Sequence, residues 1–74
     1  MKTPTLVIER GAEPHLLYGS GARWVSESDG IVTVRPIDGD AVTIRVPRRA
    51  TSLHMQGSET LTITVAIGDV IQIA

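Results

Sequence analysis

The sequence contains no cysteine and no phenylalanine, and Trp24 and Tyr18 are its only large aromatic residues. The absence of cysteine excludes disulfides and thiolate metal sites, so the fold needs no oxidising compartment. Without phenylalanine, the core must be built from valine, isoleucine and leucine. In a chain of 74 residues, such a core contributes only about 3–5 kcal/mol of stability. We therefore expect the chain to bury further surface against a partner or as a homo-oligomer.

The chain also lacks an excess of either charge and lacks any long apolar run. Its net charge of −1 is not that of a protein that holds nucleic acid by bulk electrostatics. No apolar run approaches the roughly 18 residues of a membrane-spanning helix, and residues 1–13 lack the apolar stretch of a signal peptide. Nucleic acid and membranes are therefore not the expected partners.

From residue 22 onward, apolar and polar residues alternate with the period of two that is typical of half-buried strands. Most of these residues are β-branched, as strand residues often are. The pattern predicts an all-β fold, a small antiparallel β-sandwich or barrel. We predict strands at residues 5–10, 22–27, 31–36, 41–46, 52–55, 60–67 and 69–73. The predicted inward-facing residues are Val32, Val34, Val42, Ile44, Val46, Leu61, Ile63, Val65, Ile67, Ile71 and Ile73.

Two short loops are predicted to join neighbouring strands into hairpins. A three-residue loop at residues 38–40 pairs Val34 with Ile44 and keeps the apolar face together, whereas a two-residue turn at Asp38-Gly39 would mix the two faces. Because a slip of one residue turns a whole strand over, burial favours the longer loop. The same argument predicts a hairpin across residues 68–70.

The first 21 residues carry two prolines and three glycines around one short apolar run, Leu6-Val7-Ile8. Breakers at this density favour an extended arm or a loosely packed edge strand over a helix. An extended segment can bind a partner by pairing with the edge of the partner's sheet. We therefore predict an N-terminal arm at residues 1–21, with Leu6, Val7 and Ile8 as partner contacts, and a β domain at residues 22–74.

Little in the sequence predicts catalysis, a metal or a cofactor. His15 and His54 are the only side chains suited to act as a base near neutral pH, and the sequence places no geometric partner beside either. Asp38 and Asp40 could bring two carboxylates to one loop, but the other ligands of a calcium loop are missing. Aspartate at turns is explained by local backbone hydrogen bonds. We predict a non-enzymatic protein without a cofactor or metal.

Arginines are the strongest functional signal, because guanidinium groups bind carboxylates and phosphates in a fork geometry and are enriched at interfaces. The alternation places Arg35 and Arg45 on the solvent face of two strands predicted to be neighbours. Trp24 is either the largest plug of the core or an anchor at an interface. Two interpretations of the arginines stay open, a partner-binding patch or charges that protect an exposed sheet from aggregation. The predicted partner-binding patch consists of Arg23, Trp24, Arg35, Arg45, Arg48 and Arg49.

The stretch from Leu16 to Pro47 reads LLYGSGARWVSESDGIVTVRPIDGDAVTIRVP, a Gly-rich lead-in followed by strands of the form dG-x-V-T-V and Gd-x-V-T-I-x-V-P. It resembles the small all-β accessory proteins of tailed-phage and gene-transfer-agent particles, such as head decoration proteins and the base proteins of head spikes or fibres. The resemblance implies a non-enzymatic oligomer that binds a capsid lattice in a virion, assembled in the cytoplasm of a bacterial host. The alternative is a small barrel that binds nucleic acid or a phosphorylated partner through the arginine patch.

Overall fold

The computed structural model describes residues 4–11, 13–38 and 40–74, and these residues form eight β-strands and no helix. The predicted all-β class is therefore confirmed. Within the described ranges, no helix is available that could cross a membrane. The strands are β1 (Thr5–Arg10), β2 (Glu13–Tyr18), β3 (Arg23–Val25), β4 (Gly30–Asp38), β5 (Val42–Arg45), β6 (Leu53–Met55), β7 (Leu61–Val65) and β8 (Val70–Ile73).

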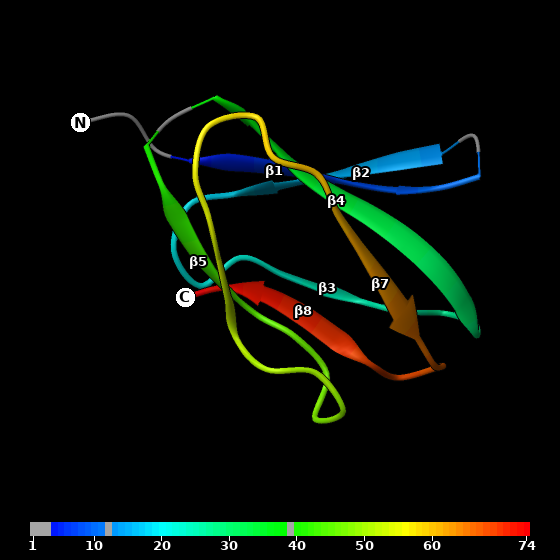
Figure 1. Cartoon of the computed structure of the whole chain (residues 1–74). Helices are drawn as coiled ribbons and strands as arrows, with labels where there is room; N and C mark the ends of the chain where they lie inside the picture. The colour runs from blue at the N-terminus through cyan, green and yellow to red at the C-terminus, as the bar shows by residue number, and fades with distance from the viewer. Residues whose placement is uncertain (1–3, 12, 39) are drawn as a thin grey trace.

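Two four-stranded antiparallel sheets pack together as a small β-sandwich, as predicted (Figure 1). The first sheet has the strand order β2-β1-β4-β7 and the second has the order β3-β8-β5-β6. This is the strand order of the eight-stranded jelly roll, with one difference. Strands β2 to β8 take the places of the first seven strands of that fold, and β1 takes the place of the eighth. The strand that ends a jelly roll thus begins this chain.

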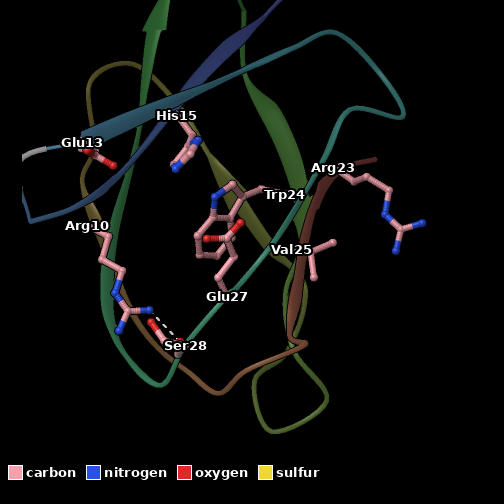
Figure 2. Close-up of a pocket in the computed structure, with 8 residues that line it drawn as sticks. All are labelled: Arg10, Glu13, His15, Arg23, Trp24, Val25, Glu27 and Ser28. Carbon is pink, nitrogen blue, oxygen red and sulfur yellow. Dashed lines mark hydrogen bonds between the residues drawn. The ribbon is translucent and has the colours of Figure 1, made fainter.

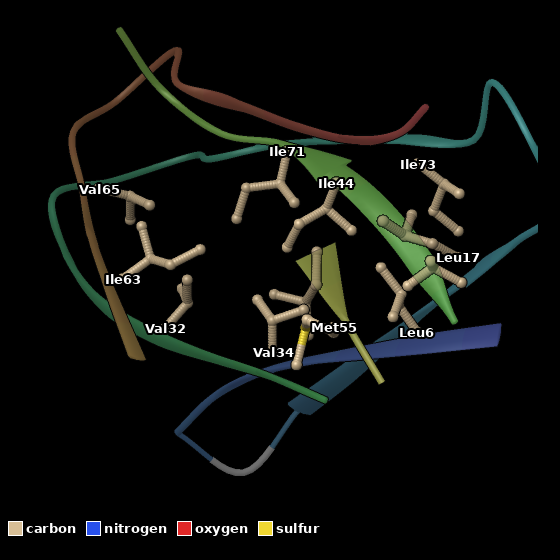
Figure 3. Close-up of a cluster of buried hydrophobic side chains, with 12 residues drawn as sticks. Leu6, Leu17, Val32, Val34, Ile44, Met55, Ile63, Val65, Ile71 and Ile73 are labelled. Atoms are coloured by element: carbon tan, nitrogen blue, oxygen red, sulfur yellow. The ribbon is translucent and has the colours of Figure 1, made fainter. Parts of the chain in front are cut away.

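The core lies between the two sheets and is built from aliphatic side chains and Met55 (Figure 3). The predicted inward faces are confirmed along β4, β5, β7 and β8, where buried residues alternate with less buried ones. Ile67 is the exception, because it lies in the turn after β7 and is 71% exposed. The buried core residues are Leu6, Ile8, Leu17, Val32, Val34, Val42, Ile44, Met55, Ile63, Val65, Ile71 and Ile73.

The two predicted hairpins are wrong. Strand β4 pairs with β1 and β7, whereas β5 pairs with β6 and β8. The chain therefore crosses from one sheet to the other between β4 and β5, and again between β7 and β8. Gly39, in the predicted 38–40 loop, lies outside the described residues. Two strands can bury their apolar faces either as neighbours in one sheet or across the core in different sheets. The burial pattern is the same in both cases, so it could not tell a hairpin from a crossing between sheets.

The predicted N-terminal arm is wrong for residues 5–18, while residues 1–3 and 12 lie outside the described residues. Strand β1 is a central strand of the first sheet, paired with both β2 and β4. Leu6 and Ile8 are completely buried, and Leu17 of β2 also reaches the core. Pro14 fits into β2 because β2 is an edge strand. A division into an arm and a β domain at residue 21 is therefore replaced by one sandwich that includes β1 and β2.

Candidate functional site

A pocket of about 360 Å³ opens at the side of the sandwich where β2 and β3 form the edges of their sheets (Figure 2). We call it the edge pocket. Its walls come from the end of β1, from β2 and β3, and from the loop that joins β3 to β4. The residues that line it are Arg10, Glu13, His15, Arg23, Trp24, Val25, Glu27 and Ser28.

Strand β2 contributes Glu13 and His15 to the edge pocket. Alternate residues of a strand share a face, so both lie on the same side of β2 as the buried Leu17. In the β1–β2 pairing, Glu13 lies opposite Arg10 and His15 lies opposite Ile8. Leu17 is buried in the core, whereas Glu13 and His15 are exposed and line the pocket. The inner face of β2 therefore contacts the core at Leu17 and lines the pocket at Glu13 and His15.

Trp24 forms an aromatic wall of the edge pocket. It lies opposite the buried Ile71 of β8, and so on the inner face of β3. Because β3 is an edge strand, the indole is only partly buried: it packs against the core and also lines the pocket. The His15 ring lies 6.1 Å from the Trp24 ring, measured between centroids, with the ring planes inclined by 52°. The interpretation of Trp24 as a core residue is thus correct for part of its surface, and the rest is open to a ligand.

Arg10 holds the loop that carries Ser28 against the end of β1. Its guanidinium donates hydrogen bonds to the carbonyl oxygens of Ser28, at 2.6 Å, and of Asp29. Gly30 permits this approach, because a Cβ there would lie 2.6 Å from Nη2 of Arg10, and its φ of +154° is one that other residues rarely adopt. These contacts fix the position of the loop that presents Glu27 to the pocket.

The lining of the edge pocket carries both signs of charge. Glu13 and Glu27 contribute carboxylates, and Arg10 and Arg23 contribute guanidinium groups. With His15 neutral, the formal charges cancel. Figure 2 shows the Arg23 side chain extending away from Trp24. In the part of the chain that the structure describes, no three side chains of histidine, aspartate or glutamate are grouped as metal ligands would be.

The five predicted arginines do not form one patch. Arg35 lies on the outer face of the first sheet, where its Nη2 atom is 3.2 Å from Oε1 of Glu9. Arg23 and Arg45 lie on the outer face of the second sheet, each opposite Gln72 of β8. The thickness of the sandwich therefore separates Arg35 from the other two. The prediction was wrong because it treated β4 and β5 as neighbours in one sheet.

Arg48 and Arg49 lie in the turn between β5 and β6, and Arg48 is exposed. The Arg49 guanidinium donates a hydrogen bond to the carbonyl oxygen of Thr64, 2.7 Å from Nη2, and forms an ion pair with Asp69. The same Asp69 carboxylate accepts a hydrogen bond from the backbone N–H of Ala66 at 2.6 Å. Arg49 therefore ties the β5–β6 connection to β7 and to the turn that follows it.

The run Leu6-Val7-Ile8, predicted to contact a partner, is buried within the chain itself. Leu6 and Ile8 belong to the core. Val7 lies on the outer face of the first sheet, between Leu16 of β2 and Arg35 of β4, and is only 3% exposed. The prediction is wrong because β1 is a central strand of the first sheet. Leu6 and Ile8 face the core between the sheets, and Val7 is flanked by residues of β2 and β4.

The outer face of the first sheet nevertheless exposes large apolar side chains. The strand register places Leu16 beside Val7, and Tyr18 follows two residues later on the same face. On β4, Ile31 shares a face with Arg35. Ile37 lies at the β-bulge between Pro36 and Asp38, where Asp38 comes opposite Thr5 of the same face. Leu16, Tyr18, Ile31 and Ile37 are between 47% and 62% exposed, and they are four of the six large hydrophobic residues exposed in the described ranges. We call these four residues the outer apolar face.

Sequence reasoning found only Arg23 and Trp24 among the eight residues of the edge pocket. It missed Arg10, Glu13 and His15 because residues 1–21 were assigned to an arm. It missed Val25, Glu27 and Ser28 because nothing in the sequence indicated that β3 and the loop after it lie beside β2. The alternation of Glu13, His15 and Leu17 was the available signal, and the neighbouring proline and glycines outweighed it. No protein-family model, no curated protein and no solved structure matches the chain.

Proposed function

We propose that the chain is a non-enzymatic structural subunit of a larger protein assembly, and that it associates with further copies of itself through the outer apolar face. The observation that carries this proposal is the placement of Leu16, Tyr18, Ile31 and Ile37 on one side of one sheet. Single exposed hydrophobic residues are common on protein surfaces, whereas several on one face mark an interaction surface.

The composition of this sheet face is suited to a protein partner. The ion pair between Arg35 and Glu9 neutralises the arginine within the chain. The β4–β7 register adds Thr33, Thr62 and Thr64 to the same face, so apolar side chains are interspersed with hydroxyl groups. Tyrosine, with an apolar ring and a polar tip, is enriched at protein interfaces. Such a surface can be desolvated against another protein without leaving Arg35 as an unpaired buried charge.

The assembly that we propose is a particle of the tailed-phage or gene-transfer-agent kind, with a capsid lattice as the wider partner. The support is the resemblance of residues 16–47, which run from β2 to the end of β5. The jelly-roll strand order agrees with this proposal, because viral capsid domains use that architecture. A fold by itself does not define a function, so the proposal of a particle depends on the resemblance.

The alternative of an arginine patch that binds nucleic acid or a phosphorylated partner has less support. Arg35 and Arg49 are each paired with a carboxylate of this chain. Arg23 and Arg45 lie on the outer face of the other sheet, and Arg48 lies in the turn between β5 and β6. Electrostatic binding of a polyanion depends on several cations acting together on one surface, and this arrangement divides them.

The native mass of the intact protein tests the proposal. Light scattering after size-exclusion chromatography should give a multiple of the 7.9 kDa chain mass. Leu16→Lys should give the monomer mass, because it would bury a charge at the contact. Ile67→Lys is the matched control, since Ile67 is exposed in the turn after β7 and lies off the outer apolar face. A monomeric wild-type chain, or an oligomer that Leu16→Lys leaves intact, would contradict the proposal.

A further inference from the structure

We propose that the edge pocket binds a saccharide. The proposal does not rest on the proposed function, because the edge pocket and the outer apolar face are formed by different sets of residues. It rests on three features of the pocket: a fixed aromatic wall, a lining of mixed charge, and a loop held in place before any ligand binds.

The aromatic wall is Trp24. Its indole packs against the core and also lines the edge pocket, so its orientation is set by the fold. One face of a sugar ring carries mainly C–H groups, which can pack on a flat aromatic surface through dispersion and the hydrophobic effect. His15, inclined by 52° to the indole, gives the pocket a second ring plane. The two rings therefore offer adjoining aromatic surfaces on which the C–H face of a sugar can pack.

The charged groups favour a neutral ligand with many hydroxyl groups. Glu13 and Glu27 repel an anion, and Arg10, together with Arg23 at the rim of the pocket, repels a cation, so the lining attracts neither sign strongly. Each of these groups is nevertheless a strong hydrogen-bonding partner. Carboxylates accept hydrogen bonds from hydroxyl groups, and guanidinium groups donate to them. A sugar combines an apolar ring face with hydroxyl groups that can donate hydrogen bonds to the carboxylates and accept them from the guanidinium groups.

The pocket is partly organised in advance. Arg10 is bonded to the carbonyl oxygens of Ser28 and Asp29, which fixes the loop beside Glu27. Binding groups that are already in place lose less conformational freedom when the ligand arrives. The volume of about 360 Å³ lies near the lower end of the range of roughly 300–1,000 Å³ for small-molecule pockets. We therefore expect one sugar unit to occupy it, either free or as the end of a longer chain.

Fluorescence of Trp24 tests the proposal directly, because Trp24 is the only tryptophan in the chain. The intact protein is titrated with methyl glycosides of glucose, galactose, mannose and fucose and with N-acetylglucosamine and N-acetylgalactosamine. Arginine amide and inorganic phosphate serve as the cationic and anionic probes. At least one sugar should change the fluorescence saturably, with a Kd in the millimolar range, and the two charged probes should not. Two-dimensional NMR should place the shifted amides around the edge pocket.

A pair of surface variants separates binding at the pocket from general effects. Glu27→Ala removes an exposed carboxylate of the pocket and should weaken sugar binding at least about tenfold, or about 1.4 kcal/mol. Glu59→Ala removes an exposed carboxylate from the connection between β6 and β7 and should leave the affinity unchanged. Three outcomes would overturn the proposal: no sugar of this panel binds, a charged probe binds more tightly than every sugar, or both variants weaken binding equally.

Discussion

At the scale of single residues, burial separates the side chains that stabilise the sandwich from those that cover it. Ile44 of β5 and Ile63 of β7 are buried on the inner faces of opposite sheets. Their neighbours Thr43 and Thr62 are exposed on the outer faces. Because the core contains no phenylalanine, each isoleucine is a large share of the buried apolar surface, and we expect its loss to be costly.

Truncation of these inner isoleucines should therefore destabilise the protein far more than truncation of the adjacent threonines. Ile44→Ala and Ile63→Ala should each lower the free energy of unfolding by about 2–5 kcal/mol, and the milder Ile44→Val by about 0.5–1.5 kcal/mol. Thr43→Ala and Thr62→Ala should cost less than about 1 kcal/mol. Urea denaturation followed by circular dichroism measures all five. Equal or larger losses at the threonines would show that the faces are inverted.

At the scale of elements, the pairing of β1 determines what the first part of the chain contributes. Strand β1 lies between β2 and β4 in the first sheet, and its residues Leu6 and Ile8 reach the core. Residues 5–18 thus supply two of the four strands of that sheet, including a central one. Removing them would expose the inner edge of β4 and open one side of the core to water.

Deletion of residues 1–21 should accordingly abolish folding. The remaining chain would keep all of β3 to β8 but would lack Leu6, Ile8 and Leu17 from the core. In a domain this small, such a loss exceeds the few kcal/mol of net stability available, about 3–5 kcal/mol. NMR spectra of the truncated chain should show the narrow dispersion of an unfolded protein. A truncated chain that gives dispersed spectra and unfolds cooperatively would mean that β1 and β2 are dispensable after all.

Local patterns in the sequence predicted the position of most strands and the face that each one buries, but not which strands are neighbours. The alternation requires only that the inward side chains of Val32–Val34 and Val42–Ile44 contact an apolar surface. A strand of the opposite sheet provides that surface as well as a neighbouring strand of the same sheet does. The prediction missed β2 altogether because Pro14 suggested that no strand was there. Proline is tolerated in a strand at the edge of a sheet, and only the complete topology shows that β2 is an edge strand. The edge pocket was missed with it.

At the scale of the whole molecule, the sandwich is a jelly roll whose closing strand comes first. The two described ends of the chain lie near each other, because Pro4 and Ala74 line the same cavity of about 300 Å³. A short connection could therefore join Ala74 to β1, which would make β1 the last strand. The strand order of the chain would then be that of an ordinary jelly roll, with every strand pairing unchanged.

A circular permutant tests this description of the topology. A chain that begins at Glu13, joins Ala74 to Met1 and ends at Ala12 should fold with the same circular dichroism spectrum and the same NMR dispersion as the parent. Permutation is tolerated where the ends lie close together and the new break falls in a connection between strands. The break falls between β1 and β2. A permutant that stays unfolded, while the parent folds, would count against the jelly-roll assignment.

The sandwich also separates its two candidate surfaces, with the outer apolar face on one sheet and the edge pocket at the side between the two sheets. The central claim is that copies of the chain associate through the outer apolar face. NMR spectra of methyl and aromatic side chains, recorded over a range of protein concentrations, test it most directly. The signals of Leu16, Tyr18 and Ile37 should shift with concentration, while those of Ile67 and Val25 stay constant. Constant signals from the outer apolar face, or shifts confined to Ile67 and Val25, would contradict the claim.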